Sequence, residues 1–204
     1  MEKFIDENII IQEHGEFGYR RRTQFNVDNS DLTVAFGLDF NTAGEVLTKK
    51  LAVKKNEQAF VAISLDYEPI GAARILYKTI KTLNNTGNTI KTINIAGNGI
   101  YTLNKFDISQ TSLNRYMFLV LQKVHEHLPI AMIRSGGQTG VDTAGIVAAI
   151  ALNIPSACTF PKNFTQRNEK GFDYNSNEKA LRRNFYMMAE ELKQPVPSMT
   201  FSHR

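Results

Sequence analysis

The stretch Met132-Ile133-Arg134-Ser135-Gly136-Gly137-Gln138-Thr139-Gly140-Val141-Asp142-Thr143-Ala144-Gly145-Ile146 decides the fold, because an apolar run leads into a glycine-rich turn that opens an alanine-rich segment. Glycine tolerates positive φ and carries no Cβ, so the chain can turn sharply and a ligand can approach its main chain. A helix beginning at Val141 leaves its first N–H groups unpaired at the positive end of its dipole, where a phosphate fits. The stretch therefore predicts a strand, a turn with an anion site, and a helix.

The side chains of this turn favour a ligand site over a turn that serves packing alone. Hydroxyl and amide donors stand between the glycines, and the predicted phosphate loop consists of Ser135, Gly136, Gly137, Gln138, Thr139 and Gly140. No GK[ST] follows and the spacing is not GxGxxG, so the turn is neither a Walker loop nor a dinucleotide fingerprint. We expect Gly137→Val to abolish phosphate binding and to leave the fold largely intact.

Length and composition predict one cytoplasmic domain. A chain of 204 residues can bury a full core, and we expect a single domain over 1–204, with 1–18 as an N-terminal extension and 195–204 as a tail. No apolar run reaches the roughly 20 residues of a membrane helix, and no basic-then-apolar leader opens the chain. The net charge of +4 is spread along the chain, which argues against duplex DNA as a partner. The lone Cys158 supplies neither a disulfide nor a metal cluster, and we expect no metal.

Short apolar runs alternate with segments of helical periodicity along the chain. Strands are predicted at 32–37, 59–65, 92–99, 130–134 and 156–160, with a possible short strand at 9–11. Helices are predicted at 44–52, capped by Thr42, and at 70–83, 109–127, 141–152 and 177–192. This alternation predicts an α/β fold, a Rossmann-like three-layer α/β/α sandwich with a mostly parallel sheet. Ligands bind such sheets at the carboxyl ends of the strands.

The glycine-rich turn also resembles a known family. Residues 135–142, SGGQTGVD, resemble the signature of the molybdenum-cofactor carrier family, a branch of the superfamily that includes the LOG phosphoribohydrolases and the DprA-like nucleotide-binding domains. Four further segments resemble the same family: FPK at 160–162, RTQFNVDNSD at 22–31, TAGEVLT at 42–48 and INIAG at 93–97. In that family the SGGQTG segment comes first, so this chain resembles a circular permutation in which the helix at 109–127 joins the old end to the old start.

The resemblance implies a nucleotide or nucleotide derivative bound at the strand ends, and no other cofactor is indicated. Beyond the glycine loop, the implied contacts are Arg22, Thr23, Gly44, Gly97, Asn98 and Lys162. Ala43 departs from the family, because it replaces the first glycine of a pair and narrows the space for a ligand. Superfamily members often associate, which implies a homo-oligomer.

These residues, together with the resemblance, support several candidate functions. The first is a nucleotide-binding protein that acts as sensor, carrier or sequestering protein; the second is hydrolysis of a nucleotide N-glycosidic bond, as in LOG-type relatives. The LOG pattern places its glutamate where this chain has Lys50, which leaves Glu45 and Asp142 as weak catalytic candidates that also suit helix N-termini. Carriage of molybdenum cofactor rests on the family name alone. An interaction module without a small ligand remains the simplest alternative.

Overall fold

A parallel sheet of six strands forms the centre of the molecule. The computed structural model describes residues 8–16 and 18–194, and the strands follow the order β1-β6-β5-β4-β2-β3 with every neighbouring pair parallel. The strands are β1 Ile9–Glu13, β2 Leu32–Gly37, β3 Phe60–Ser64, β4 Thr92–Gly97, β5 Met132–Ser135 and β6 Ser156–Phe160. The fold is therefore α/β, with the parallel sheet that the alternating pattern predicted.

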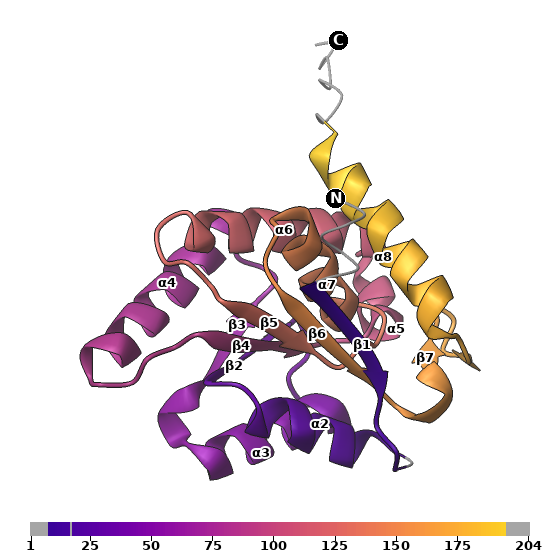
Figure 1. Cartoon of the computed structure of the whole chain (residues 1–204), viewed down its shortest axis with the longest axis horizontal. Helices are drawn as coiled ribbons and strands as arrows, with labels where there is room; N and C mark the ends of the chain where they lie inside the picture. The colour runs from indigo at the N-terminus through magenta and orange to yellow at the C-terminus, as the bar shows by residue number, and fades with distance from the viewer. Residues whose placement is uncertain (1–7, 17, 195–204) are drawn as a thin grey trace.

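Helices cover both faces of this sheet (Figure 1). One face carries α2 Tyr19–Asp28 and α3 Ala43–Lys55, and the other carries α4 Pro69–Asn85, α6 Gln110–His125, α7 Val141–Ala151 and α8 Glu178–Lys193. The remaining elements are short: α5 Ile100–Leu103, the 3-10 turns Glu57–Ala59, Asn104–Phe106 and Lys162–Phe164, and the hairpin of β7 Gln166–Arg167 with β8 Asp173–Tyr174. The arrangement is the three-layer Rossmann-like sandwich expected from the sequence.

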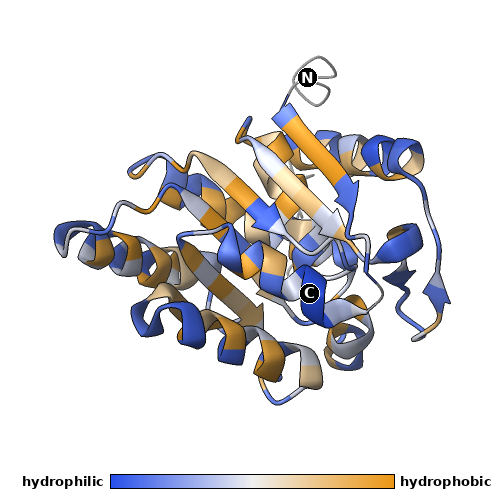
Figure 2. Ribbon diagram, turned by 60° about the horizontal axis from the view of Figure 1, so that its bottom comes forward, coloured by the Kyte–Doolittle hydropathy of each residue, from blue (hydrophilic) through white to orange (hydrophobic). Residues whose placement is uncertain are grey.

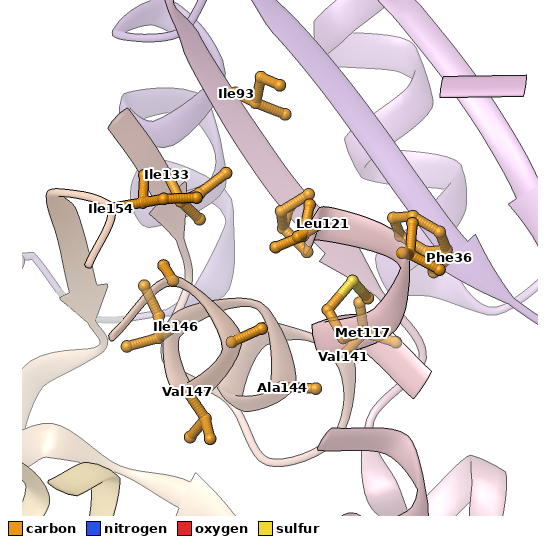
Figure 3. Close-up of a cluster of buried hydrophobic side chains, with 14 of the residues drawn as sticks. Phe36, Ile93, Met117, Leu121, Ile133, Val141, Ala144, Ile146, Val147 and Ile154 are labelled. Carbon is orange, nitrogen blue, oxygen red and sulfur yellow. The ribbon is translucent and has the colours of Figure 1, made fainter. Parts of the chain in front are cut away.

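The core is densest around α7, which lies between the sheet and the helices α6 and α8. Every residue of α7 is buried, and Figure 3 shows Val141, Ile146 and Val147 among side chains from α6 and the sheet. Gly145 brings α7 close to β4, because a Cβ there would lie 2.7 Å from the Ile95 side chain. The alanine-rich composition of this helix is thus a consequence of close packing on both sides. Outer helices instead alternate hydrophobic and hydrophilic residues (Figure 2), as one-sided burial requires.

Three parts of the fold differ from the sequence-based expectation. The strand at 9–13 pairs with β6 and extends the sheet, so this part of residues 1–18 is not an extension; 1–7 and the tail 195–204 lie outside the described residues. The segment 19–28 is a helix, although its polar sequence shows no apolar stripe of helical periodicity. The strand predicted at 59–65 is the shorter β3, Phe60–Ser64, an edge strand in which only Ile63 is buried.

The permutation requires β4 and β5 to share the sheet. They do, with Thr92 opposite Met132, and α6 joins them. Sequential strands commonly pair in folds of this class, so the family resemblance stays a prediction. No helix within 8–16 and 18–194 has both the length and the apolar character needed to cross a membrane.

Candidate functional site

A cavity of about 530 Å³ opens at the carboxyl ends of the strands, where the direction of winding reverses. After β2 the chain crosses by α3 on one face of the sheet, and after β4 it crosses by α6 on the other face. The loops that follow these neighbouring strands therefore diverge, which is where doubly wound sheets bind their ligands. The volume is within the range of small-molecule sites. The cavity is lined by Tyr19, Arg22, Thr23, Asn26, Thr42, Ala43, Gly44, Glu45, Leu47, Thr48, Asn94, Ala96, Gly97, Gly99, Ile100, Tyr101, Thr102, Lys105, Gly136, Gln138, Thr139, Asp142 and Arg167.

The cavity brings together residues that are far apart in the sequence. The predicted site residues that line it are Arg22, Thr23, Gly44, Glu45, Gly97, Gly136, Gln138, Thr139 and Asp142. The predicted site residues that do not line it are Ser135, Gly137, Gly140, Asn98 and Lys162. The glycine-rich loop is thus one wall of the cavity, with part of the loop turned into the protein.

Three backbone amides of the glycine-rich loop have acceptors within the protein. The Gln138 amide donates to the Asp142 carboxylate at 3.2 Å, and the Thr139 amide donates to the Gln138 side-chain oxygen at 3.2 Å. The Gly140 amide donates to the side-chain oxygen of Gln110 at 2.6 Å.

Backbone amides at the start of α7 are also hydrogen-bonded within the protein. The Val141 amide donates to the Asn98 carbonyl at 3.1 Å, and the Thr143 amide donates to the Gln138 carbonyl at 3.0 Å. The amides of Gln138, Thr139, Gly140, Val141 and Thr143 are thus engaged by protein oxygens. The phosphate site predicted at Ser135 to Gly140 stays a prediction.

Burial explains why three residues of the loop do not reach the cavity. Ser135 is fully buried at the end of β5. Gly137 has a φ of 74°, and a Cβ there would lie 2.6 Å from the Phe160 ring. Gly140 has a φ of 93°, and its Cβ would lie 2.5 Å from the Asn98 carbonyl oxygen. The expectation that Gly137→Val leaves the fold largely intact is therefore wrong, since valine would collide with Phe160.

A buried ion pair lies at the inner end of the cavity. The Arg22 guanidinium donates from Nη1 to the Gly136 carbonyl and, at 3.2 Å, to the Asp142 carboxylate; the two side chains are 9% and 8% exposed. Burial raises the pKa of Asp142, and the charge of Arg22 and the Gln138 amide oppose that rise. Arg22 reaches this position because it lies on the inner side of α2, the helix that the sequence pattern did not reveal.

Glu45 is a second acidic group at the inner end. It lies in the first turn of α3, which is capped by the Thr42 hydroxyl, as predicted, and it is 9% exposed. Burial raises its pKa to about 7; its own backbone N–H opposes the rise, and the nearby Asp142 charge adds to it. A buried carboxyl group that titrates near neutral pH in a cleft is a typical acid–base candidate.

Basic and aromatic residues occupy the outer end of the cavity. Lys105 and Arg167 are both exposed, and the Lys105 ammonium lies 4.6 Å from the centre of the Tyr101 ring. Arg167 forms two hydrogen bonds with Asp173, at 2.7 and 3.0 Å, and this pairing raises the pKa of Arg167. Sequence analysis missed these residues, because a hairpin of two-residue strands and a four-residue helix leave no periodic signal.

The hairpin is attached to the glycine-rich loop by hydrogen bonds. The Gln166 side chain donates to the Gly137 carbonyl at 2.7 Å, and the Arg167 amide donates to the Gln138 side-chain oxygen at 2.8 Å. The Thr139 hydroxyl donates to the Arg167 carbonyl. Residues 134–142 therefore support the hairpin as well as the wall of the cavity.

Two residues predicted to contact the ligand lie outside the cavity lining. The Asn98 side chain holds the loop after β2, and Lys162 lies in the 3-10 turn after β6. Neither residue lines the cavity. Cys158 is fully buried in β6, and the described part of the chain contains no group of three or more His, Cys, Asp or Glu side chains placed to hold a metal ion.

The cavity is therefore acidic at its buried inner end and basic at its exposed outer end. Comparison with known proteins adds no relative: no family model, no curated protein and no solved structure matches this chain.

Proposed function

We propose that the cavity binds a nucleotide or a nucleotide derivative. The observation that supports this proposal most directly is the separation of charge along a cavity of about 530 Å³ at the switch point of the sheet. A nucleotide has a matching polarity, because its phosphate is anionic and its ribose carries neutral hydroxyl donors. The phosphate faces the outer end and the ribose faces the inner end.

The outer end suits a phosphate better than the glycine-rich loop does. Lys105 and Arg167 line the cavity there and are exposed, whereas the amides of Gln138, Thr139 and Gly140 are engaged. With Arg22, the lining contains three basic side chains against the two acidic groups Glu45 and Asp142. Arg22 pairs with Asp142 and Arg167 pairs with Asp173, so the remaining positive charge is that of Lys105, which favours an anionic ligand; protonation of Glu45 leaves this charge unopposed.

The inner end suits hydroxyl donors. Carboxylates bind ribose hydroxyl groups in dinucleotide-binding sheets of this architecture. Glu45 and Asp142 both line the cavity from helix starts on opposite sides of the crevice, α3 and α7. We expect a ribose bound between these two residues to donate hydrogen bonds from its hydroxyl groups to their carboxyl oxygens. The basic side chains lie at the outer end, away from these oxygens.

A thermal-shift panel of nucleosides and of nucleoside mono-, di- and cyclic phosphates tests the proposal. We expect phosphorylated forms to raise the melting temperature, and Lys105→Ala to weaken that rise. Lys81→Ala is the matched control, because Lys81 also lies over a tyrosine ring, Tyr77, but on α4 outside the cavity lining. No shift with any phosphorylated nucleotide, or equal losses in both variants, would refute the proposal.

Hydrolysis of the N-glycosidic bond is the second candidate, and Glu45 supports it. A carboxyl group with a pKa of about 7 can exchange a proton near neutral pH. Beside the ribose, an ionised Glu45 can accept a proton from an attacking water, and both carboxylates stabilise positive charge on the sugar. The chemistry requires a water molecule and releases a free base and a phosphorylated ribose.

Base release distinguishes the two candidates. We expect Glu45→Gln to retain the nucleotide-induced thermal shift and to abolish any release of free base, which chromatography of the incubated mixture measures. Thermal shift without base release in the wild-type protein supports binding alone. Undiminished base release by Glu45→Gln excludes Glu45 as the catalytic residue.

A further inference from the structure

Asn98 follows the last residue of β4 and is 1% exposed. Its side-chain oxygen accepts hydrogen bonds from the amides of Leu38 and Asp39, at 2.9 and 3.0 Å, and its side-chain nitrogen donates to the Asp39 carbonyl at 2.7 Å. All three bonds go to the loop that leads from β2 to α3. The amide side chain therefore acts as a clamp on this loop.

The backbone of Asn98 extends the clamp to two further elements. Its N–H donates to the Phe36 carbonyl at 3.1 Å, and its carbonyl accepts from the Val141 amide at 3.1 Å. Asn98 thus connects the end of β2, the start of α3 through the loop, and the start of α7. The starts of α3 and α7 both line the cavity.

Two glycines provide the space for this clamp. A Cβ at Gly37 would lie 2.8 Å from the side-chain oxygen of Asn98. Gly97 has a φ of 152°, and a Cβ there would collide with the Phe36 carbonyl. Side chains at either position would displace the Asn98 amide or separate β4 from β2.

The clamped loop determines where Glu45 lies. Glu45 faces acidic groups from two directions, Asp142 on α7 and Asp39 on the loop itself, and both raise its pKa. The Asn98 amide opposes them, because its hydrogen bond to the Glu45 carboxylate lowers the pKa. The nearest buried cation, Arg22 on α2, pairs with Asp142.

We infer that Asn98 is a positioning residue, which fixes Glu45 at the inner end of the cavity by clamping the β2–α3 loop between β4 and α7. This role replaces the ligand contact expected of Asn98 from the sequence. Its importance for activity rests on the proposed function, but the positioning itself is a property of the ligand-free protein and is tested there.

The test measures Glu45 directly by NMR titration of its side-chain carboxyl carbon, assigned by its loss in Glu45→Gln, together with amide hydrogen exchange of Leu38 and Asp39. In Asn98→Ala both amides lose their acceptor and Glu45 loses the hydrogen bond that lowers its pKa. We therefore expect faster exchange at these two positions and a Glu45 pKa above that of the wild-type protein. In Asn98→Asp the acceptor remains and a negative charge is added, so we expect retained protection and a Glu45 pKa raised by about 1 unit or more.

Asn114→Ala is the matched control for a purely structural role. Asn114 is a 3% exposed asparagine of α6 that lies outside the cavity lining; it accepts a hydrogen bond from the Gln110 side chain at 2.8 Å and donates to the Met188 sulfur at 3.4 Å. We expect this variant to lose stability with an unchanged Glu45 pKa. Identical Glu45 titrations in Asn98→Ala and Asn114→Ala would overturn the inference. If Asn98→Ala does not fold, a wild-type Glu45 pKa in Asn98→Asp overturns it, whatever the nucleotide panel shows.

Discussion

Arg22 and Asp142 lie 120 positions apart in the chain, and Nη1 of Arg22 donates to the Asp142 carboxylate at 3.2 Å within the wall of the cavity. The same carboxylate accepts from the Gln138 amide, so one buried group holds both α2 and the glycine-rich loop. The ion pair therefore connects α2, a helix that the sequence pattern did not predict, with the glycine-rich turn, which the sequence predicted most clearly.

Breaking this pair should destabilise the protein strongly. Arg22→Leu leaves the Asp142 charge buried without its cation, and we expect a loss of about 3–5 kcal/mol in the free energy of unfolding, measured by urea denaturation. Arg21→Leu is the control, because Arg21 pairs with Glu16 on the surface with its side chain 65% exposed, and surface pairs contribute about 0–1 kcal/mol. Equal midpoints for the two variants would contradict a structural role for the buried pair.

Glu45 should make stability depend on pH in a defined window. Its folded-state pKa of about 7 lies above the ordinary value of 4.5, so the native protein holds this proton more tightly than the unfolded chain does. The resulting stability is complete below pH 4.5 and is lost as the pH rises to about 7. The shift corresponds to about 3 kcal/mol.

Glu45→Gln removes this dependence. Urea denaturation at pH 5, 6, 7 and 8 should show the variant gaining stability relative to the wild-type protein as the pH rises, whereas Glu57→Gln, at an exposed position, should follow the wild-type curve. Parallel curves for Glu45→Gln and the wild-type protein would show that Glu45 is ionised normally in the folded state.

Substitutions at Gly140 and Gly87 should distinguish the cost of a positive φ from the cost of a steric clash, because the two glycines have nearly the same φ. Gly140 and Gly87 have φ values of 93° and 90°, but only Gly140 has neighbours that a Cβ would strike, the Asn98 carbonyl at 2.5 Å among them. We expect Gly87→Ala to cost about 1 kcal/mol of unfolding free energy and Gly140→Ala about 2–5 kcal/mol. Similar costs would mean that the contact between Gly140 and β4 is easily relieved.

Cys158 should be protected from thiol reagents. It is fully buried in β6, and burial raises the pKa of its thiol well above the ordinary value. The reactive thiolate is therefore scarce as well as inaccessible. We expect labelling by a disulfide reagent only on unfolding, with a rate that rises in step with urea concentration; complete labelling of the native protein within minutes would show that β6 opens readily.

The sequence by itself determined the layered fold. Apolar runs at 32–37, 92–97 and 156–160 and the amphipathic periods between them reflect burial against neighbouring layers, and this information is local. Thr42, Ser109 and the glycines of the central turn likewise mark helix starts and sharp turns from the residue type alone. The position of the cavity followed from the same reasoning, because parallel strands bring their carboxyl ends to one edge.

Only the tertiary structure decided the chemistry of that edge. The glycine-rich loop has the composition of a phosphate cradle, but Gln110 reaches the Gly140 amide from α6, and Asn98 reaches the Val141 amide from the end of β4. Burial raises the pKa values of Glu45 and Asp142, and the Asp142 charge adds to the rise at Glu45. Lys105 and Arg167 both line the outer end of the cavity from elements too short to leave a pattern. Hydrogen-bond partners and desolvation depend on what lies nearby in space, and a local pattern of residues does not contain that information.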